Sequence, residues 1–284
     1  MNTFLLLTIV LGVSIQQICK KAYNIRITNG TFSFSAASAL FAAIFFVATS
    51  GGSIIPPATA LPYSILFSLS YIIATVSSML AISTGPLSLT SLILQYSLVL
   101  PALYGIVMLD EEVDILLISG IVLLLISILF INKEDKGEKK KITLKWSIFA
   151  FLSFLGNGCC SIIQKEQQLR CDGMYKNEFM ILSLIITFVV LAVYALCKEK
   201  DNTSQKLKKG FIWFAVCGLA NGLVNFLVLV LSTRMPASVM FPVISAGGIV
   251  ITAAVSIFVY KEKLSLSQKI GMILGTFAII ILSI

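Results

Sequence analysis

The sequence predicts an all-α integral membrane protein with ten transmembrane helices, arranged as two inverted five-helix repeats. Three observations support this fold class: 58% of the 284 residues are hydrophobic and only 12% are charged, residues 27–109 contain no Asp, Glu, Lys or Arg, and the two halves share a residue pattern. An ordinary soluble domain has about 45–50% apolar and about 25% charged residues. The composition therefore excludes a water-soluble globule.

Charges, prolines and turn residues divide the chain into ten apolar segments. A helix needs roughly 20 mainly apolar residues to cross the hydrocarbon core, so the uncharged stretch 27–109 has room for three spans. The expected spans are 3–20, 31–50, 59–83, 86–109 and 114–132 in the first half, and 146–165, 178–197, 210–233, 236–259 and 266–284 in the second. No charged residue precedes the first apolar run, so we interpret it as a retained span and not as a secretory signal.

The two halves are interpreted as a first repeat over 1–132 and a second repeat over 146–284, joined by a charged linker over 133–145. A shift of 150 residues lays Pro86 on Pro236, Ser88 on Ser238 and Glu112 on Glu262; near the start of each half, LGVSIQQICKKA aligns with LGNGCCSIIQKE, which pairs Gly12 with Gly156 and Lys20 with Lys165. Five is an odd number, so the second repeat must enter the membrane from the opposite side, as in many secondary transporters.

The distribution of basic residues predicts the orientation, because short cytoplasmic loops carry an excess of Lys and Arg. The loops after the odd-numbered spans hold 17 of the 21 basic residues. We therefore expect these loops in the cytoplasm and both termini outside the cell, with the protein in the plasma or inner membrane.

Two segments resemble a known family: GPLSLTSLILQYSLVLPALYGIVMLDEEVDILLISGIVLLLISILFI and MPASVMFPVISAGGIVITAAVSIFVYKEKLSLSQKIGMILGTFAIIILSI. Each contains a helix rich in small residues, a turn centred on Glu112 or Glu262, and a closing apolar helix. In this order of elements the chain resembles the ten-span members of the drug/metabolite transporter superfamily, with two EamA-like repeats. The resemblance implies a carrier with a central cavity between the repeats, lined mainly by spans 1, 3, 4, 6, 8 and 9.

Polar uncharged side chains within the spans are the main candidates for a substrate pathway, because an amide in hydrocarbon needs a partner in protein, water or substrate. Gly218, Asn221, Gly222 and Asn225 fall on one helical stripe, which suits either a cavity wall or close helix packing. The residues expected to line the pathway are Gln16, Tyr71, Gln95, Tyr96, Asn157, Asn221, Asn225 and Ser245.

Charged side chains near the span ends allow two interpretations. Lys20 and Lys165 occupy matching positions, where they either snorkel into the interface or flank opposite mouths of the pathway and attract an anionic or zwitterionic substrate. Glu178 heads a span and is a possible proton site, although an acidic residue there also suits solvation at the interface.

These patterns predict a secondary transporter, either an exporter or an exchanger, that moves a small organic metabolite or drug-like solute by alternating access. The alternatives are a lipid-headgroup flippase, a structural or regulatory membrane component without flux, and a lipid-modifying enzyme. For the enzyme, the nearest candidate group, DEEVD, has no basic or nucleophilic partner in its own segment. We expect no enzyme activity, because the chain has no histidine and no nucleotide-binding glycine motif.

The sequence also limits the expected cofactors and partners. No metal-ligand spacing or redox motif is present, and the six cysteines are interpreted as small buried hydrophobes. Because the basic residues are spread over short loops, we expect no nucleic-acid partner. The expected partners are the lipid bilayer and a small-molecule substrate, with the protein a monomer or homodimer.

Overall fold

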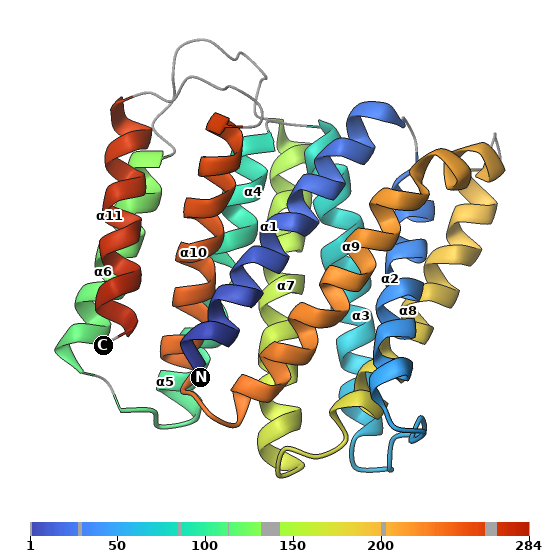
Figure 1. Cartoon of the computed structure of the whole chain (residues 1–284), viewed down its shortest axis with the longest axis horizontal. Coiled ribbons are helices and arrows are strands. Elements are labelled where there is room, and N and C mark those ends of the chain that lie inside the picture. The colour runs from blue at the N-terminus through green and yellow to red at the C-terminus, as the bar shows by residue number, and fades with distance from the viewer. Residues whose placement is uncertain are drawn as a thin grey trace.

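The computed structural model describes residues 2–27, 30–84, 87–112, 114–131, 143–199, 203–258 and 266–283, and within these ranges every regular element is a helix (Figure 1). The helices are α1 Asn2–Arg26, α2 Thr31–Thr49, α3 Leu61–Thr84, α4 Leu87–Tyr96, α5 Val99–Met108, α6 Ile115–Ile131, α7 Leu144–Arg170, α8 Lys176–Lys198, α9 Thr203–Ser232, α10 Ala237–Phe258 and α11 Leu266–Ser283. Linker residues 133–142, Pro86 and Glu262 lie outside the described residues.

The helices lie roughly side by side, and the chain passes from one end of the bundle to the other and back (Figure 1). Both termini lie towards the same end, together with the connections α2–α3, α5–α6, α7–α8 and α9–α10. α6 and α11 pack against each other at one edge of the bundle, beside α10.

Each expected span coincides with one helix, except segment 86–109, which forms the two helices α4 and α5. Pro101 explains the break, because proline has no N–H to donate to the carbonyl of Ser97. The Leu100 N–H donates to that carbonyl instead, at 3.2 Å. Pro242, by contrast, lies inside α10 without dividing it.

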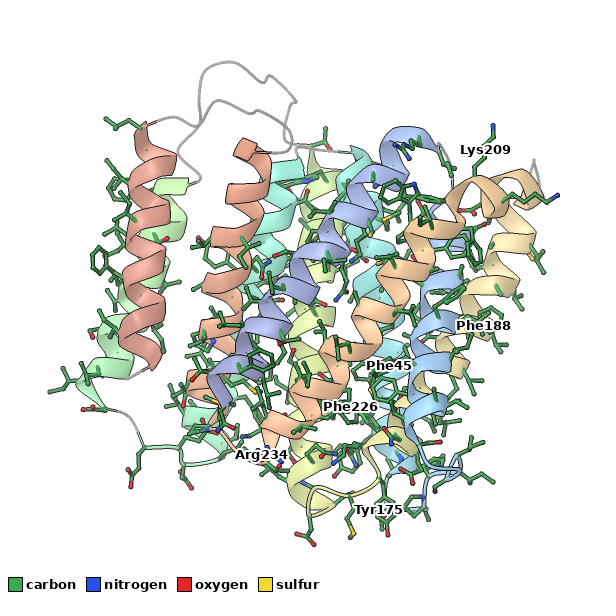
Figure 2. All side chains as sticks on the ribbon, in the orientation of Figure 1. Phe45, Tyr175, Phe188, Lys209, Phe226 and Arg234 are labelled. Atoms are coloured by element: carbon green, nitrogen blue, oxygen red, sulfur yellow. The ribbon has the colours of Figure 1, made fainter. Side chains whose placement is uncertain are left out.

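In the described part of the chain, six helices are long and apolar enough to cross a membrane: α1, α2, α3, α7, α8 and α9. Shorter apolar stretches follow at Ile93–Met108, Ile118–Ser127 and Ala237–Gly248. Large apolar side chains such as Leu7, Ile65 and Val193 are more than half exposed, which is the surface expected of helices that face lipid. Lys209 lies at one end of the bundle, and Tyr175 and Arg234 lie at the other (Figure 2).

Glycines allow close crossings at two helix pairs that form the centre of the bundle. A Cβ on Gly156 of α7 would lie 2.8 Å from the backbone nitrogen of Ala74 on α3. A Cβ on Gly12 of α1 would lie 2.5 Å from a methyl group of Val224 on α9. These crossings bring α1, α3, α7 and α9 around one central space.

Candidate substrate cavity

A cavity of about 150 Å³ lies between α1, α3, α4, α7, α9 and α10. These helices occupy the spans 1, 3, 4, 6, 8 and 9 that the resemblance implied. Its apolar wall includes Ile9, Val13, Phe67, Phe241 and Ile244. Its polar lining consists of Gln16, Gln17, Lys20, Tyr71, Thr75, Ser78, Gln95, Asn157, Ser161, Gln164, Asn221 and Asn225.

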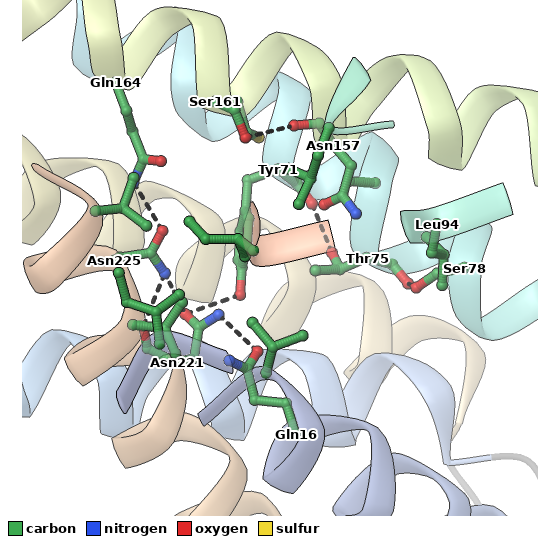
Figure 3. Close-up of a pocket in the computed structure, with 18 of the residues that line it drawn as sticks. Gln16, Tyr71, Thr75, Ser78, Leu94, Asn157, Ser161, Gln164, Asn221 and Asn225 are labelled. Carbon is green, nitrogen blue, oxygen red and sulfur yellow. Dashed lines mark hydrogen bonds between the residues drawn. The ribbon is translucent and has the colours of Figure 1, made fainter. Parts of the chain in front are cut away.

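A hydrogen-bonded chain of side-chain amides crosses one wall of the cavity (Figure 3). Gln164 Nε2 donates to Asn225 Oδ1 at 2.7 Å, and Asn225 Nδ2 donates to Asn221 Oδ1 at 3.1 Å. Asn221 Nδ2 donates in turn to Gln16 Oε1 at 3.1 Å. The amides of α7, α9 and α1 are therefore linked across the two halves of the chain.

Tyr71 joins the same network from α3, because its hydroxyl donates to Asn221 Oδ1 at 3.2 Å. The Tyr71 ring stacks on Phe67, with ring centroids 5.6 Å apart. Asn221 Oδ1 thus accepts hydrogen bonds from both Tyr71 and Asn225, which orients its Nδ2 towards Gln16. Asn221 is the centre of the network.

The other expected pathway residues take different positions. Asn157 and Gln95 line the cavity with their side chains. Ser245 is buried and donates from Oγ to the backbone carbonyl of Gln95 at 2.9 Å, close to the break between α4 and α5. Tyr96 packs against the apolar cluster that contains Met240. Ser245 and Tyr96 therefore support the wall and do not line it.

The stripe of Gly218, Asn221, Gly222 and Asn225 on α9 has two structural roles. Gly218 meets the backbone carbonyl of Ser38 on α2, and a Cβ on Gly222 would lie 2.8 Å from Phe45 Cβ of the same helix. Asn221 and Asn225 turn towards the cavity instead. Close packing and cavity lining are thus both present, on adjacent faces of one helix.

Sequence reasoning missed Gln164, which connects α7 to the amide network. Asn157, Ser161 and Gln164 are spaced by four and three residues, so they share one helix face. Extending the stripe from Asn157 would have found Gln164.

Lys20 and Lys165 differ sharply in their surroundings. Lys20 lines the cavity and a smaller adjoining hollow. Lys165 is 4% exposed and donates from Nζ to the carbonyls of Ser232 and Met235, at 2.9 and 2.8 Å. Its Nζ also lies 3.6 Å from Glu111 Oε1. Lys165 therefore links α7 to the carboxyl end of α9 and does not snorkel.

Glu111, in the connection between α5 and α6, caps the amino end of α10. Its carboxylate accepts from the backbone N–H groups of Ala237 and Ser238, at 2.7 and 2.8 Å. Burial acts to raise the pKa of Glu111, but these hydrogen bonds and the Lys165 ammonium outweigh burial and hold the pKa below its ordinary value. Glu111 is thus an anionic clamp between the two halves.

Glu178 lies in the first turn of α8, where a negative charge interacts favourably with the helix dipole. It is not among the residues that line the cavity.

Four of the cysteines are buried as expected, but Cys159 and Cys197 are exposed. Both lie on helices with outward-facing apolar side chains. Among the described residues, no group of His, Cys, Asp or Glu is suited to hold a metal ion.

The long apolar helices define a multi-pass membrane protein. Residues 144–284 match the EamA-like transporter family, a match that suggests a membrane transporter of small solutes and is consistent with the drug/metabolite transporter superfamily. Members of this family are typically not enzymes. No curated protein matches the chain.

A solved structure described only as "Crystal structure of protein" shares the fold. Its TM-score is 0.78, and the match covers 100% of this chain and 98% of that chain at 11% sequence identity. The likeness extends over both halves, including the first half that lies outside the family match.

Proposed function

We propose that this protein is a secondary transporter of the cell membrane that exports or exchanges a small organic solute by alternating access. The observation that carries the proposal is the amide-lined cavity between the two halves. α1, α3 and α4 come from the first half, and α7, α9 and α10 from the second. Movement of one half against the other would change which end of the cavity is open.

Equivalent helix contacts support the arrangement as two inverted repeats. The sequence correspondence places α1 on α7 and α3 on α9, so it exchanges the α1–α9 crossing at Gly12 with the α3–α7 crossing at Gly156. The pairs α2–α8 and α6–α11 each join equivalent helices. This symmetry favours ten spans, with the short helices α4 and α5 forming one of them.

The clamp formed by Lys165 and Glu111 supports alternating access, because it ties the halves together at one end. Lys165 belongs to the second half and Glu111 to the first, and both bind backbone groups at the turn between α9 and α10. Opening this end requires α7 to move away from that turn, which breaks these bonds. The clamp is therefore suited to close one side of the pathway.

Charge at the two ends of the bundle supports the orientation. Arg26, Lys198 and Lys209 lie at the end opposite the termini, whereas Asp110 and Glu112 lie at the end where the termini are. The positive-inside rule then places the end with Lys209 in the cytoplasm and both termini outside.

Counterflow in proteoliposomes tests the function. Vesicles that contain the protein are loaded with amino acids, nucleosides, sugars, quaternary amines or lipid headgroups, and uptake of the labelled solute is followed. We expect uptake for one class, and its loss in Asn221→Ala but not in Asn177→Ala. Asn177 is a matched control, because its amide donates to the Thr49 carbonyl outside the cavity. Absence of counterflow for every class with folded protein would contradict the proposal.

A further inference from the structure

Lys20 is the only charged side chain, among the residues that the structure describes, that lines either the cavity or the adjoining hollow. It lies six residues before the end of α1, which is about 9 Å along the helix axis. Its side chain is partly exposed and borders the cavity, whereas a lysine within a helix bundle is normally paired with a counter-charge.

Lys20 has no such partner in the described part of the chain. No described carboxylate lies within ion-pair distance of its Nζ, and no described acceptor takes a hydrogen bond from it. Its repeat equivalent Lys165 is, by contrast, satisfied by Ser232, Met235 and Glu111. Within the described ranges, one lysine of the pair is thus bonded to the fold, while the other borders the cavity without a counter-charge.

Several groups around Lys20 can donate hydrogen bonds to a ligand. Gln16 Oε1 accepts from Asn221, which turns this oxygen towards α9, and the Gln16 amide nitrogen carries two N–H donors. Gln17 lines the same cavity, and the hydroxyls of Ser35 and Ser38 on α2 border the hollow beside Lys20. An ammonium beside amide N–H and hydroxyl groups, with no lining carboxylate among the described residues, suits an anion.

The volume limits the size of the ligand. A cavity of 150 Å³ lined by apolar side chains accommodates benzene in another protein, and the cavity here has about that volume. Val13, Phe67 and Phe241 supply the apolar wall. The remaining space therefore suits a compact apolar body.

We propose that Lys20 binds the carboxylate of a small monoanionic solute, with Gln16 donating a second hydrogen bond and the Phe67 and Phe241 side of the cavity holding the apolar part. This inference rests on the proposed transport function and adds the chemical class of its substrate. It assigns Lys20 a direct contact with the ligand, whereas Lys165 acts only on the fold.

Two pairs of isosteric probes test the site, because each pair differs in charge and hardly in shape. Binding of benzoate and benzamide, and of butyrate and butyramide, is measured by calorimetry on the detergent-purified full chain. We expect the wild type to bind the carboxylates and to bind the amides about tenfold more weakly or worse, since a charge-assisted hydrogen bond is lost. Equal affinity for benzoate and benzamide would overturn the proposal.

Variants of Lys20 assign the charge to this residue. Lys20→Gln should weaken benzoate binding at least about tenfold and leave benzamide binding unchanged, while Lys20→Arg should retain a preference for benzoate. Lys209→Gln is the matched control, because Lys209 is exposed at the end of the bundle. Unchanged benzoate affinity in Lys20→Gln would overturn the proposal. If Lys20→Gln does not give a monodisperse protein, loss of the benzoate preference in Lys20→Arg overturns it instead.

Counterflow separates this inference from the transport proposal. Flux of a neutral or cationic solute, without binding of any carboxylate probe, overturns the anion site and leaves the transport function standing. Lysine-dependent binding of benzoate without counterflow of any solute supports the site and overturns the transport function. Alanine added as a further probe distinguishes a zwitterion from a simple carboxylate: binding of butyrate but not alanine supports the monoanion, and the reverse overturns it.

Discussion

The Tyr71 hydroxyl donates to Asn221 Oδ1 at 3.2 Å, and the two residues are 150 positions apart, the same shift that relates the two halves of the sequence. Ser245 Oγ and the Gln95 carbonyl are also 150 positions apart and lie 2.9 Å from each other. Under the proposed repeat symmetry, a residue that touches its own equivalent lies next to the axis that relates the two halves. The proposal therefore sets the cavity around that axis, where a movement of either half would act on it directly.

Removing the Tyr71 hydroxyl should weaken the network modestly, whereas removing the Asn221 side chain should weaken it strongly. Tyr71→Phe deletes one donor, which costs about 0.5–1.5 kcal/mol. Asn221→Ala leaves groups of Tyr71, Gln16 and Asn225 without their partner, each at a cost of about 1–3 kcal/mol where water cannot reach.

Thermal unfolding in detergent of the single variants and of the Tyr71→Phe/Asn221→Ala double variant measures this coupling. We expect the double variant to be no less stable than Asn221→Ala alone, because the Tyr71 hydroxyl has already lost its acceptor. Strictly additive losses would show that the hydrogen bond between these two residues does not contribute to stability.

Alanine at the two crossing glycines should be destabilising to different degrees. At Gly156 the new methyl group meets the backbone of Ala74 and Ser70, so α7 and α3 must separate. At Gly12 it meets first a methyl group of Val224, a side chain that can move more easily than backbone. We expect Gly156→Ala to lose about 1–3 kcal/mol and Gly12→Ala less. A greater loss at Gly12, measured in the same unfolding assay, would contradict this packing.

The Glu111 clamp should make stability depend on pH in the acid range. The folded pKa of Glu111 lies below its ordinary value of 4.5, so the carboxylate stabilises the folded state fully above that value. This contribution is lost as the pH falls through the folded pKa. Glu111→Gln should therefore lower the melting temperature at neutral pH and flatten its decline in acid.

Glu112→Gln is the matched control for that experiment, because Glu112 is an exposed neighbour in the same connection. This variant should keep the wild-type acid profile. Acid profiles that are the same for Glu111→Gln and the wild type would show that Glu111 is not the group responsible.

A reporter fused after Ile284 tests the orientation of the protein in the membrane. With both termini outside, alkaline phosphatase, which folds only outside the cytoplasm, should be active there, and a fluorescent protein that matures only inside should not. The same pair of reporters fused after Lys209, in a truncated chain, should give the opposite result. A fluorescent fusion after Ile284 would place the basic end of the bundle outside.

Local chemistry predicts much of this architecture but little of its long-range bonding. The apolar lengths located the helices, apart from the division of segment 86–109 into α4 and α5, because hydrocarbon-facing helices carry a strong compositional signal. Asn221 and Gln16 were accessible as candidates, since an amide in a span is unusual. The break at Pro101 was not predicted, because the Ser245 hydroxyl that donates to the Gln95 carbonyl beside the break comes from α10.

The hydrogen-bond partners of Lys165 could not be predicted from the sequence, for a related reason. Its acceptors are two backbone carbonyls 67 and 70 residues away, and backbone groups carry no sequence signature. The sequence does not single out Glu111, because its neighbours Asp110 and Glu112 are charged too. Only the packing of α7 against the turn between α9 and α10 distinguishes it from them.

Alternating access is tested most directly by labelling one cysteine in the cavity from each side of the membrane in turn. All six native cysteines, including the exposed Cys159 and Cys197, are replaced by alanine or serine, and Asn157→Cys is introduced in the cavity wall. A membrane-impermeant maleimide is applied to right-side-out and inside-out vesicles, with Lys209→Cys as the control that reacts from one side. Reaction of Asn157→Cys from both sides is the predicted result, and reaction from a single side under every condition would contradict alternating access.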